Sequence, residues 1–187
     1  EQADDFFVQY QKSKHVSLLG IHIFNSSQIL DWEKIYNNTK NVINTAKELS
    51  EKYSFKVSYI DLGGGFGIPY GTDEKHLDIK SLGISLTKLV SDKVYNEFLN
   101  GVKLIFEPGR FLSGASGIYL AKVQYKKISR GKEILLIDGG IHHFLRPVLL
   151  GASHPVVNLS AYYEGREKEK TYMVAGPLCT SLDAYGE

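Results

Sequence analysis

The sequence is poor in several features that would place a protein in a specialised class. A single cysteine among 187 residues excludes an internal disulfide and predicts a reducing compartment. No apolar run approaches the roughly 18 residues that span a membrane, and the first residues show no signal-peptide pattern. The formal net charge is +1, and the Lys and Arg residues are scattered. We therefore expect a cytoplasmic protein that binds neither nucleic acid nor a membrane surface.

What is present is an alternation of strand-like and helix-like segments. Apolar residues make up 43% of the chain, enough to form a core. Short apolar runs at 17–24, 56–62 and 102–110 predict strands, and helical spacing of apolar residues at 31–53 and 82–98 predicts the helices between them. This order is typical of parallel strands with right-handed crossovers. Three strands are too few to close a barrel, so the pattern indicates part of one.

The pattern changes near Phe111. Short runs at 117–128, 133–140, 155–163 and 170–176 predict strands, and no long helical pattern lies between them. Such strands separated by turns favour an antiparallel β region. The predicted organisation is therefore an α/β domain over residues 1–111 and a β domain over residues 112–187.

Three consecutive glycines, Gly63 to Gly65, follow the predicted strand 56–62. In a parallel α/β fold, ligands bind at the carboxyl ends of the strands. Without Cβ atoms, glycine N–H groups can approach an anion closely, and a phosphate is the usual one. A tight loop that needs positive φ explains the same run equally well. The spacing fits neither a Walker loop nor GxGxxG.

Polar and aromatic residues follow the other two predicted strands. The segment "EPGR" places Glu107 and Arg110 at the end of one strand, where a guanidinium suits a phosphate and a carboxylate suits a protonated ring nitrogen. A surface ion pair is the simpler interpretation of these two residues taken alone. His22 and Phe24 end the first strand, and each is also typical of a packed core residue.

Six segments in order resemble the pyridoxal-phosphate-dependent decarboxylases of the diaminopimelate, ornithine and arginine group (fold type III). They are "GIHIFNSSQ", "DLGGGFGIPY", "EPGRF", "DGG", "RPVLLGASHP" and "GPLCTSLD". That family folds as an eight-stranded α/β barrel followed by a β domain. The resemblance implies that this chain holds the later part of a TIM-type (β/α)8 barrel and then part of an antiparallel β domain.

The resemblance also implies a cofactor, pyridoxal 5'-phosphate, and a set of residues that bind it. Ser27, Gly63, Gly64, Gly65 and Arg110 match the residues around the cofactor phosphate. Glu107 matches the carboxylate that faces the pyridine nitrogen and keeps the ring an electron acceptor. Phe24 lies at the position that stacks on the ring, and Gly109 belongs to the same motif as Glu107.

The resemblance assigns the substrate and catalytic residues to the second half of the chain. Arg146 matches an arginine that contacts the substrate carboxylate, and Thr180 and Asp183 lie in the "GPxCxxxD" motif that contacts substrate. Cys179 of that motif comes from the partner subunit in family members and is linked to protonation after CO2 loss. The resemblance therefore implies a homodimer with shared active sites.

Three positions depart from the family pattern. Phe24 replaces a histidine, Thr180 replaces an acidic residue that holds a distal ammonium, and Leu150 replaces a tyrosine. A pocket without that carboxylate does not favour a second ammonium group. The predicted substrate is therefore a modified or carrier-protein-linked amino acid of secondary metabolism rather than a free diamino acid.

The family's Schiff-base lysine lies on a barrel strand with no counterpart in this sequence. The resemblance thus implies an internal fragment that is inactive by itself. Two functions stay open at this point: a decarboxylase, or a non-catalytic decarboxylase-like protein that binds the cofactor or regulates a partner. A generic phosphate-binding barrel enzyme is a third interpretation if the β region is unrelated to the family.

Overall fold

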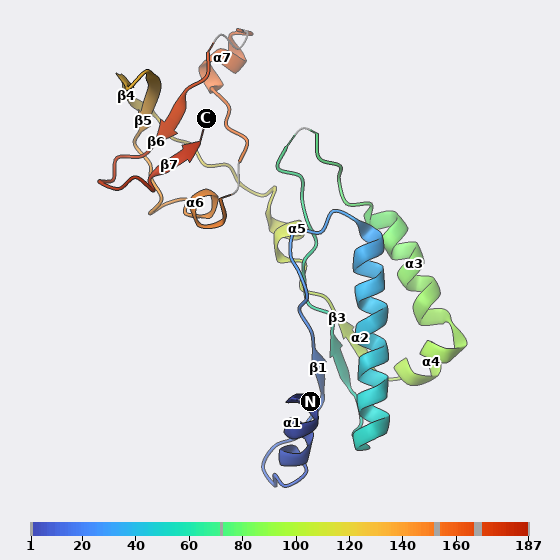
Figure 1. Ribbon diagram of the computed structural model, residues 1–187. Coiled ribbons are helices and arrows are strands. Elements are labelled where there is room, and N and C mark those ends of the chain that lie inside the picture. The colour runs from blue at the N-terminus through green and yellow to red at the C-terminus, as the bar shows by residue number, and fades with distance from the viewer. Residues whose placement is uncertain (1, 72, 152–153, 167–169, 187) are drawn as a thin grey trace. The chain divides into compact units, whose positions relative to one another are not determined.

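The computed structural model describes residues 2–71, 73–151, 154–166 and 170–186 (Figure 1). Its contacts divide the chain into two compact units, Glu1–Pro69 with Lys75–Ser116 and Tyr70–Glu74 with Gly117–Glu187. The elements of the first unit are α1 (Gln2–Tyr10), β1 (Gly20–His22), α2 (Trp32–Tyr53), β2 (Tyr59–Asp61), α3 (Ile79–Ser91), α4 (Lys93–Leu99), β3 (Lys103–Ile105) and α5 (Gly109–Ser113).

The first unit is built on a three-stranded parallel sheet in the order β1-β2-β3. Ile21, Ile60 and Leu104 lie opposite one another in the middle of the three strands. The alternation of the sequence predicted these parallel strands, and the structure confirms them. Because the strands are parallel and in register, the residues that follow all three lie at one edge of the sheet.

Helix α2 forms where the sequence predicted it and supplies more buried residues than any other helix or strand. The Asp31 carboxylate accepts a hydrogen bond from the Glu33 N–H (3.0 Å) and begins the helix, and Ser54 ends it in a left-handed conformation. Val42, Ile43 and Ala46 recur on one face and are buried against the residues of β2. Helix α3 lies beside α2 (Figure 1).

The predicted helix over 82–98 is instead two helices, α3 and α4. Asp92 separates them with an extended ψ of 134°, while its N–H still bonds to the carbonyls of Lys88 and Leu89. The Asp92 carboxylate accepts from the Val94 N–H (2.9 Å) and so begins the second helix. The apolar residues keep helical spacing across Asp92, so spacing alone does not predict that one helix ends and another begins there.

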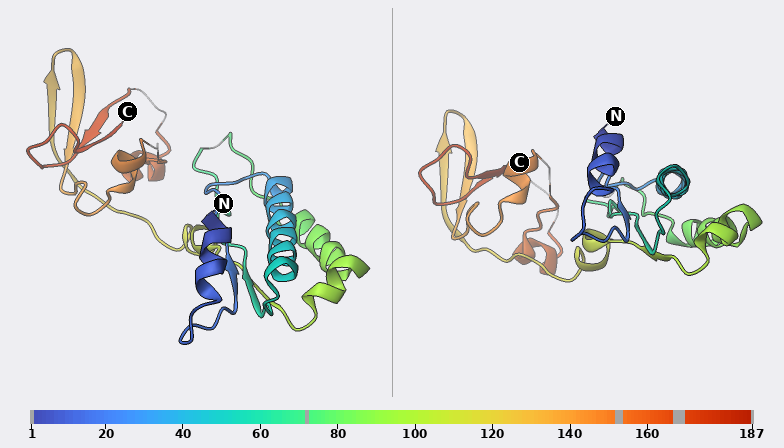
Figure 2. Two further views of the ribbon diagram at one scale, coloured as in Figure 1. Left: turned by 60° about the horizontal axis from the view of Figure 1, so that its bottom comes forward. Right: turned by 90° about the horizontal axis from the view of Figure 1, so that it is seen from below.

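The second unit contains β4 (Val123–Ser129), β5 (Lys132–Ile137), α6 (Arg146–Leu150), α7 (Leu159–Tyr163), β6 (Met173–Ala175) and β7 (Ala184–Gly186). Its four strands lie in chain order. Strands β4 and β5 form an antiparallel hairpin (Figure 2), and β6 and β7 are also antiparallel. Strands β5 and β6 are parallel. The expected antiparallel region is therefore a mixed sheet, because a long connection containing α6 and α7 joins its two middle strands.

The prediction of a strand over residues 155–163 is wrong. Residues Leu159–Tyr163 form the short helix α7 instead. The Asn158 side chain accepts a hydrogen bond from the Ala161 N–H (3.2 Å) and begins this helix. The apolar residues of the run are exposed, so they do not form the alternating buried face of a strand.

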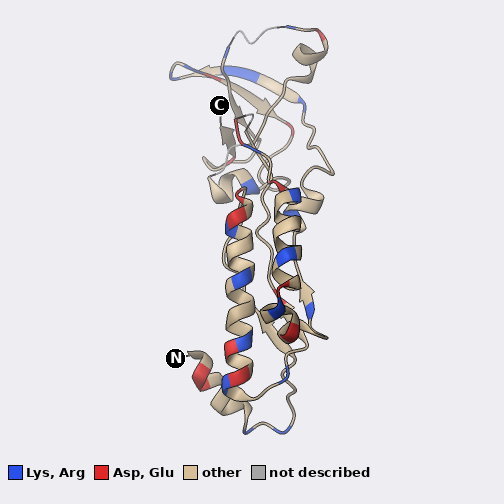
Figure 3. Cartoon of the chain, turned by 90° about the vertical axis from the view of Figure 1, so that its right-hand side faces the viewer, with Lys and Arg blue, Asp and Glu red and all other residues tan. Residues whose placement is uncertain are grey.

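Charged residues of both signs are distributed along α2 (Figure 3). Among the residues that the structure describes, no helix combines the length and apolar character needed to cross a lipid bilayer.

The buried face of α2 leads to a stability prediction. Ile43 is fully buried, whereas Ile84 on α3 is 58% exposed. Ile43→Ala leaves a cavity and should lower the free energy of unfolding by about 2–5 kcal/mol. Ile84→Ala should change it by no more than about 0.5 kcal/mol. Denaturant titration of both variants compares the two sites, and equal effects would contradict the placement of the core.

Candidate functional site

The glycine loop, residues 62–69, follows β2 at the carboxyl edge of the parallel sheet. Gly63 and Gly65 have φ values of 67° and 92°, which favour glycine. A Cβ at Gly63 would lie 2.9 Å from the Ile23 carbonyl oxygen. A Cβ at Gly64 would collide with the carbonyl of Glu107, and one at Gly65 with the carbonyl of Ser26. The glycines therefore supply positive φ at two positions and close backbone approach at all three.

Hydrogen bonds hold the glycine loop to both neighbouring segments. The Gly63 carbonyl accepts from the Glu107 N–H (2.9 Å), and the Gly65 carbonyl accepts from the Ile29 N–H (2.8 Å). The Gly63 N–H donates to the Asp61 carboxylate (3.0 Å). Within the part of the chain that the structure describes, the N–H groups of Gly64 and Gly65 donate to no protein acceptor. Two adjacent donors of this kind suit an anion.

Arg110 is tied to the same segments through a glutamine. Its Nη1 donates to Oε1 of Gln28 (2.7 Å), and the Gln28 amide nitrogen donates to the Ile68 carbonyl of the glycine loop. Among the described residues, no carboxylate forms an ion pair with Arg110. The simple ion pair with Glu107 that the "EPGR" segment allowed is therefore not formed.

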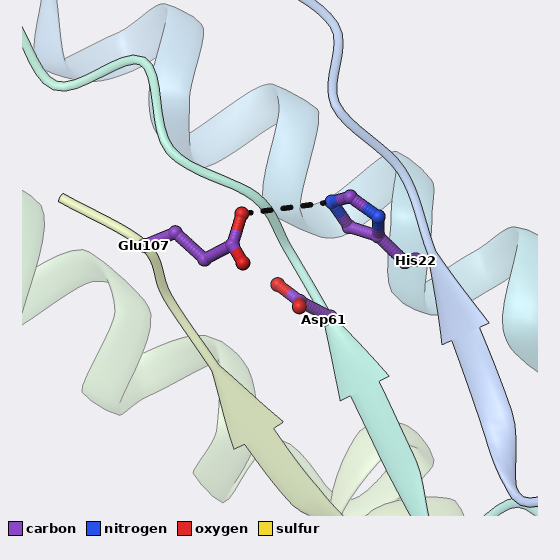
Figure 4. A group of neighbouring side chains, drawn as sticks. All are labelled: His22, Asp61 and Glu107. Atoms are coloured by element: carbon purple, nitrogen blue, oxygen red, sulfur yellow. Dashed lines mark ion pairs between the residues drawn. The ribbon is translucent and has the colours of Figure 1, made fainter. Parts of the chain in front are cut away.

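Glu107 lies instead beside an imidazole and a second carboxylate (Figure 4). His22 Nε2 is 3.7 Å from Glu107 Oε2, and one ligand atom from each of His22, Asp61 and Glu107 lies within 4.8 Å of the other two. The group could hold a divalent cation, or its carboxylates could face a protonated ring nitrogen. The His22 side chain is 52% exposed rather than packed in the core.

His22 and Asp61 are site residues that the sequence reasoning did not select. His22 lies directly opposite Asp61 in the register of β1 and β2, and Glu107 follows β3 by two residues. The available signal was the position of a polar residue at the end of each of three neighbouring strands. It was missed because a lone histidine in an apolar strand is usually a packing residue.

The remaining cofactor residues predicted from the sequence lie in the same segments. The Cα of Phe24 would be 3.3 Å from a Cβ at Gly63, and this residue is 57% exposed. Ser27 is exposed between Ser26, which contacts the glycine loop, and Gln28. Gly109 begins α5, and its N–H donates to the Glu107 carbonyl (2.8 Å).

The predicted substrate residues lie in the second unit. Arg146 is the first residue of α6. Its guanidinium carbon lies 4.4 Å from the centre of the Tyr70 ring, and its Nη1 lies 3.0 Å from His154 Nε2. Among the described residues, no acceptor pairs with the Nε of Arg146, and this atom is buried. A guanidinium is suited to bind a carboxylate through its terminal nitrogens.

The segment around Cys179 is ordered by Asp183. Cys179 is exposed and has a free thiol. Both carboxylate oxygens of buried Asp183 accept backbone hydrogen bonds, from Ile141 and from Leu178 (2.8 Å each). Thr180 Oγ1 accepts from the Leu182 N–H (3.3 Å). In this structure the two side chains stabilise the turn that exposes the thiol. Burial is also the main reason why the pKa of nearby Tyr185 rises to about 12.

Comparisons with known proteins identify a family model and relatives that match this chain. Residues 1–114 match the model for "Pyridoxal-dependent decarboxylase, pyridoxal binding domain". The chain is 31% identical over 174 residues to the L-glutamyl-(BtrI acyl-carrier protein) decarboxylase of Niallia circulans, which covers 90% of the chain and 40% of that protein. It is 30% identical over 173 residues to the diaminopimelate decarboxylase of Aquifex aeolicus, covering 92% and 38%.

Solved structures give the same result. The diaminopimelate decarboxylase of M. jannaschii superposes with a TM-score of 0.80 and 28% sequence identity, covering 98% of this chain and 41% of that one. The chain thus spans about two fifths of the length of the relatives that it matches.

The close approach at Gly64 generates a second prediction. Gly64→Ala adds a Cβ that collides with the Glu107 carbonyl, which should lower stability by about 1–3 kcal/mol and weaken anion binding at the loop. Gly83→Ala is the matched control, because a Cβ there meets no atom within 4 Å and helix α3 should gain stability. Thermal unfolding compares the two, and a Gly64→Ala protein as stable as the unmodified one would contradict the packing.

Proposed function

Since the chain belongs to the pyridoxal-dependent decarboxylase family, we propose that the complete protein removes CO2 from an amino acid or amino-acid derivative with pyridoxal 5'-phosphate as its cofactor. The observation that carries this proposal is the joining of the glycine loop, Glu107 and Arg110 at one edge of the parallel sheet. This edge offers an anion site and a carboxylate on adjacent segments, as a phosphate and a ring nitrogen require.

The residues at the glycine loop fit a phosphate. Among the described residues, no protein acceptor pairs with the N–H groups of Gly64 and Gly65, and glycine at both positions lets the loop lie close to the carbonyls of Glu107 and Ser26. Arg110 has a guanidinium that no carboxylate of the described residues neutralises. We assign these groups, together with the hydroxyl of Ser27, to the cofactor phosphate.

The residues at the other side of the site fit the ring. Glu107 would hold the protonated pyridine nitrogen of the cofactor, and His22 and Asp61 lie beside its carboxylate. Phe24 would stack on the ring, to which it cannot donate a hydrogen bond. When bound, the cofactor supplies an electron sink for the electron pair that the departing CO2 leaves behind.

The residues of the second unit serve the substrate in this proposal. Arg146 binds the substrate carboxylate through its guanidinium. The partner subunit's Cys179 delivers a proton to the carbon that has lost CO2, so the protein acts as a homodimer. Thr180 carries no charge, which favours a modified or carrier-linked amino acid over a free diamino acid. The name of one relative specifies a substrate that is linked to a carrier protein.

The proposal includes the organisation of the whole protein. Residues 1–111 are the later part of a TIM-type barrel, and residues 112–187 are part of the β domain that follows it. The complete protein is cytoplasmic. The Schiff-base lysine of the family comes from a barrel strand outside these residues.

CO2 release by the full-length protein tests the proposed reaction. Glutamyl-carrier protein, free lysine, ornithine and diaminopimelate are compared as substrates, with pyridoxal phosphate added. We expect turnover of the carrier-linked substrate. Tight cofactor binding without CO2 release from any amino acid would favour the non-catalytic alternative.

Glu107 provides a prediction on the chemistry. Glu107→Gln keeps the shape of the side chain but cannot hold the ring nitrogen protonated, so the decarboxylation rate should fall on the order of 10²-fold. Cofactor binding, followed by its absorbance, should persist because the phosphate contacts remain. Glu97→Gln on α4 is the matched control, since this side chain is exposed outside the site. An unchanged decarboxylation rate in Glu107→Gln would show that Glu107 does not keep the ring nitrogen protonated.

Thr180 provides a prediction on specificity. Thr180→Glu restores a carboxylate that can pair with a distal ammonium, and a hydrogen bond between charged groups should raise kcat/KM for a diamino acid by about tenfold or more. Thr180→Gln is the control for side-chain length without charge and should give no increase. Efficient decarboxylation of a diamino acid by the unmodified protein would show that Thr180 does not set the specificity.

A further inference from the structure

Gln28 makes the side-chain contacts that join three segments of the first unit. Its Oε1 accepts from Nη1 of Arg110 at 2.7 Å, across 82 positions of the chain. Its Nε2 donates to the carbonyl of Ile68 in the glycine loop, across 40 positions. A glutamine that follows β1 thus bridges the loop after β2 to the arginine after β3.

The chemistry of the partners fixes the orientation of the amide. A guanidinium has only donors, so it must face the amide oxygen, and a backbone carbonyl has only acceptors, so it must face the amide nitrogen. A 180° flip of the Gln28 amide would place its NH2 group against the N–H groups of Arg110 and its oxygen against the carbonyl of Ile68, so neither hydrogen bond could form. No other uncharged side chain of this length offers one acceptor and one donor at its two corners.

The backbone at Gln28 is also constrained. Its φ of 58° lies in the left-handed region, which a residue with a Cβ rarely occupies. The loop packs against this backbone, since a Cβ at Gly67 would lie 2.9 Å from the Gln28 carbonyl carbon. The next residue, Ile29, bonds to the loop on both sides, through Gly65 and Gly67. The glycine loop therefore stabilises the left-handed backbone conformation from which the Gln28 side chain makes its two hydrogen bonds.

Arg110 keeps most of its binding capacity when Gln28 holds it. A guanidinium has five N–H donors, and the amide of Gln28 uses one of them. The remaining donors can bind an anion, and bidentate binding of a phosphate requires that the planar guanidinium be held in one orientation.

We propose that Gln28 is a positioning residue that orients the Arg110 guanidinium toward the glycine loop for binding of the cofactor phosphate. The inference rests on the proposed function, because it takes the anion at the loop to be the phosphate of pyridoxal 5'-phosphate. Gln28 itself contacts the protein and acts on the phosphate through Arg110.

The test compares two ligands that differ only in the phosphate. Gln28→Met in the full-length protein keeps the length of the side chain and removes both hydrogen bonds. The dissociation constant for pyridoxal phosphate should rise by about tenfold, whereas that for pyridoxal, which lacks the phosphate, should not change. Gln9→Met, on the exposed face of α1, is the matched control and should alter neither constant.

A second variant separates positioning from folding. Gln28→Gly loses the same two hydrogen bonds as Gln28→Met but accepts the left-handed φ without strain, so its unfolding temperature should be no lower than that of Gln28→Met. It should nevertheless bind pyridoxal phosphate about tenfold more weakly, as Gln28→Met does. A Gln28→Gly protein that keeps full affinity for pyridoxal phosphate would overturn the proposal.

A double-mutant cycle tests whether Gln28 acts through Arg110. Once Arg110→Met has removed the guanidinium, adding Gln28→Met should weaken pyridoxal phosphate binding no further. Full additivity, or an equal loss of affinity for pyridoxal, would overturn the positioning role alone. Failure of the unmodified full-length protein to bind pyridoxal phosphate would instead overturn the proposed function, and this inference with it.

Discussion

At the carboxyl edge of the parallel sheet, the glycine loop lies so close to the segments after β1 and β3 that a Cβ on Gly63, Gly64 or Gly65 would meet a carbonyl of its neighbours. This contact fixes the site, because it sets how far apart the three segments are. Backbone hydrogen bonds from Glu107 and Ile29 then hold them in place. Larger side chains would push the segments apart and separate the groups that surround the loop.

The site has two electrostatic ends on one rigid frame. Uncommitted N–H groups and Arg110 favour negative charge at one end, while Asp61 and Glu107 favour positive charge at the other. A ligand with a phosphate and a protonated ring nitrogen matches both ends. The family to which the chain belongs is named for such a ligand.

The second unit uses a buried carboxylate for a different purpose. Asp183 bonds to two backbone N–H groups and thereby shapes the turn that exposes Cys179. Thr180, within that turn, can change without disturbing this network, since its own hydrogen bond is local. Position 180 thus lies on a turn whose shape is maintained by its neighbours.

Local features of this protein can be predicted from its sequence. Helical spacing and a capping residue specify α2, and a run of glycines at a strand end marks the loop, because each depends on residues close together in the chain. The tertiary structure alone decided that residues 155–163 include a helix, that β5 and β6 are parallel, that His22 faces Glu107, and that Gln28 holds Arg110. The last three are contacts between distant positions, and periodicity carries no information on which distant side chains meet.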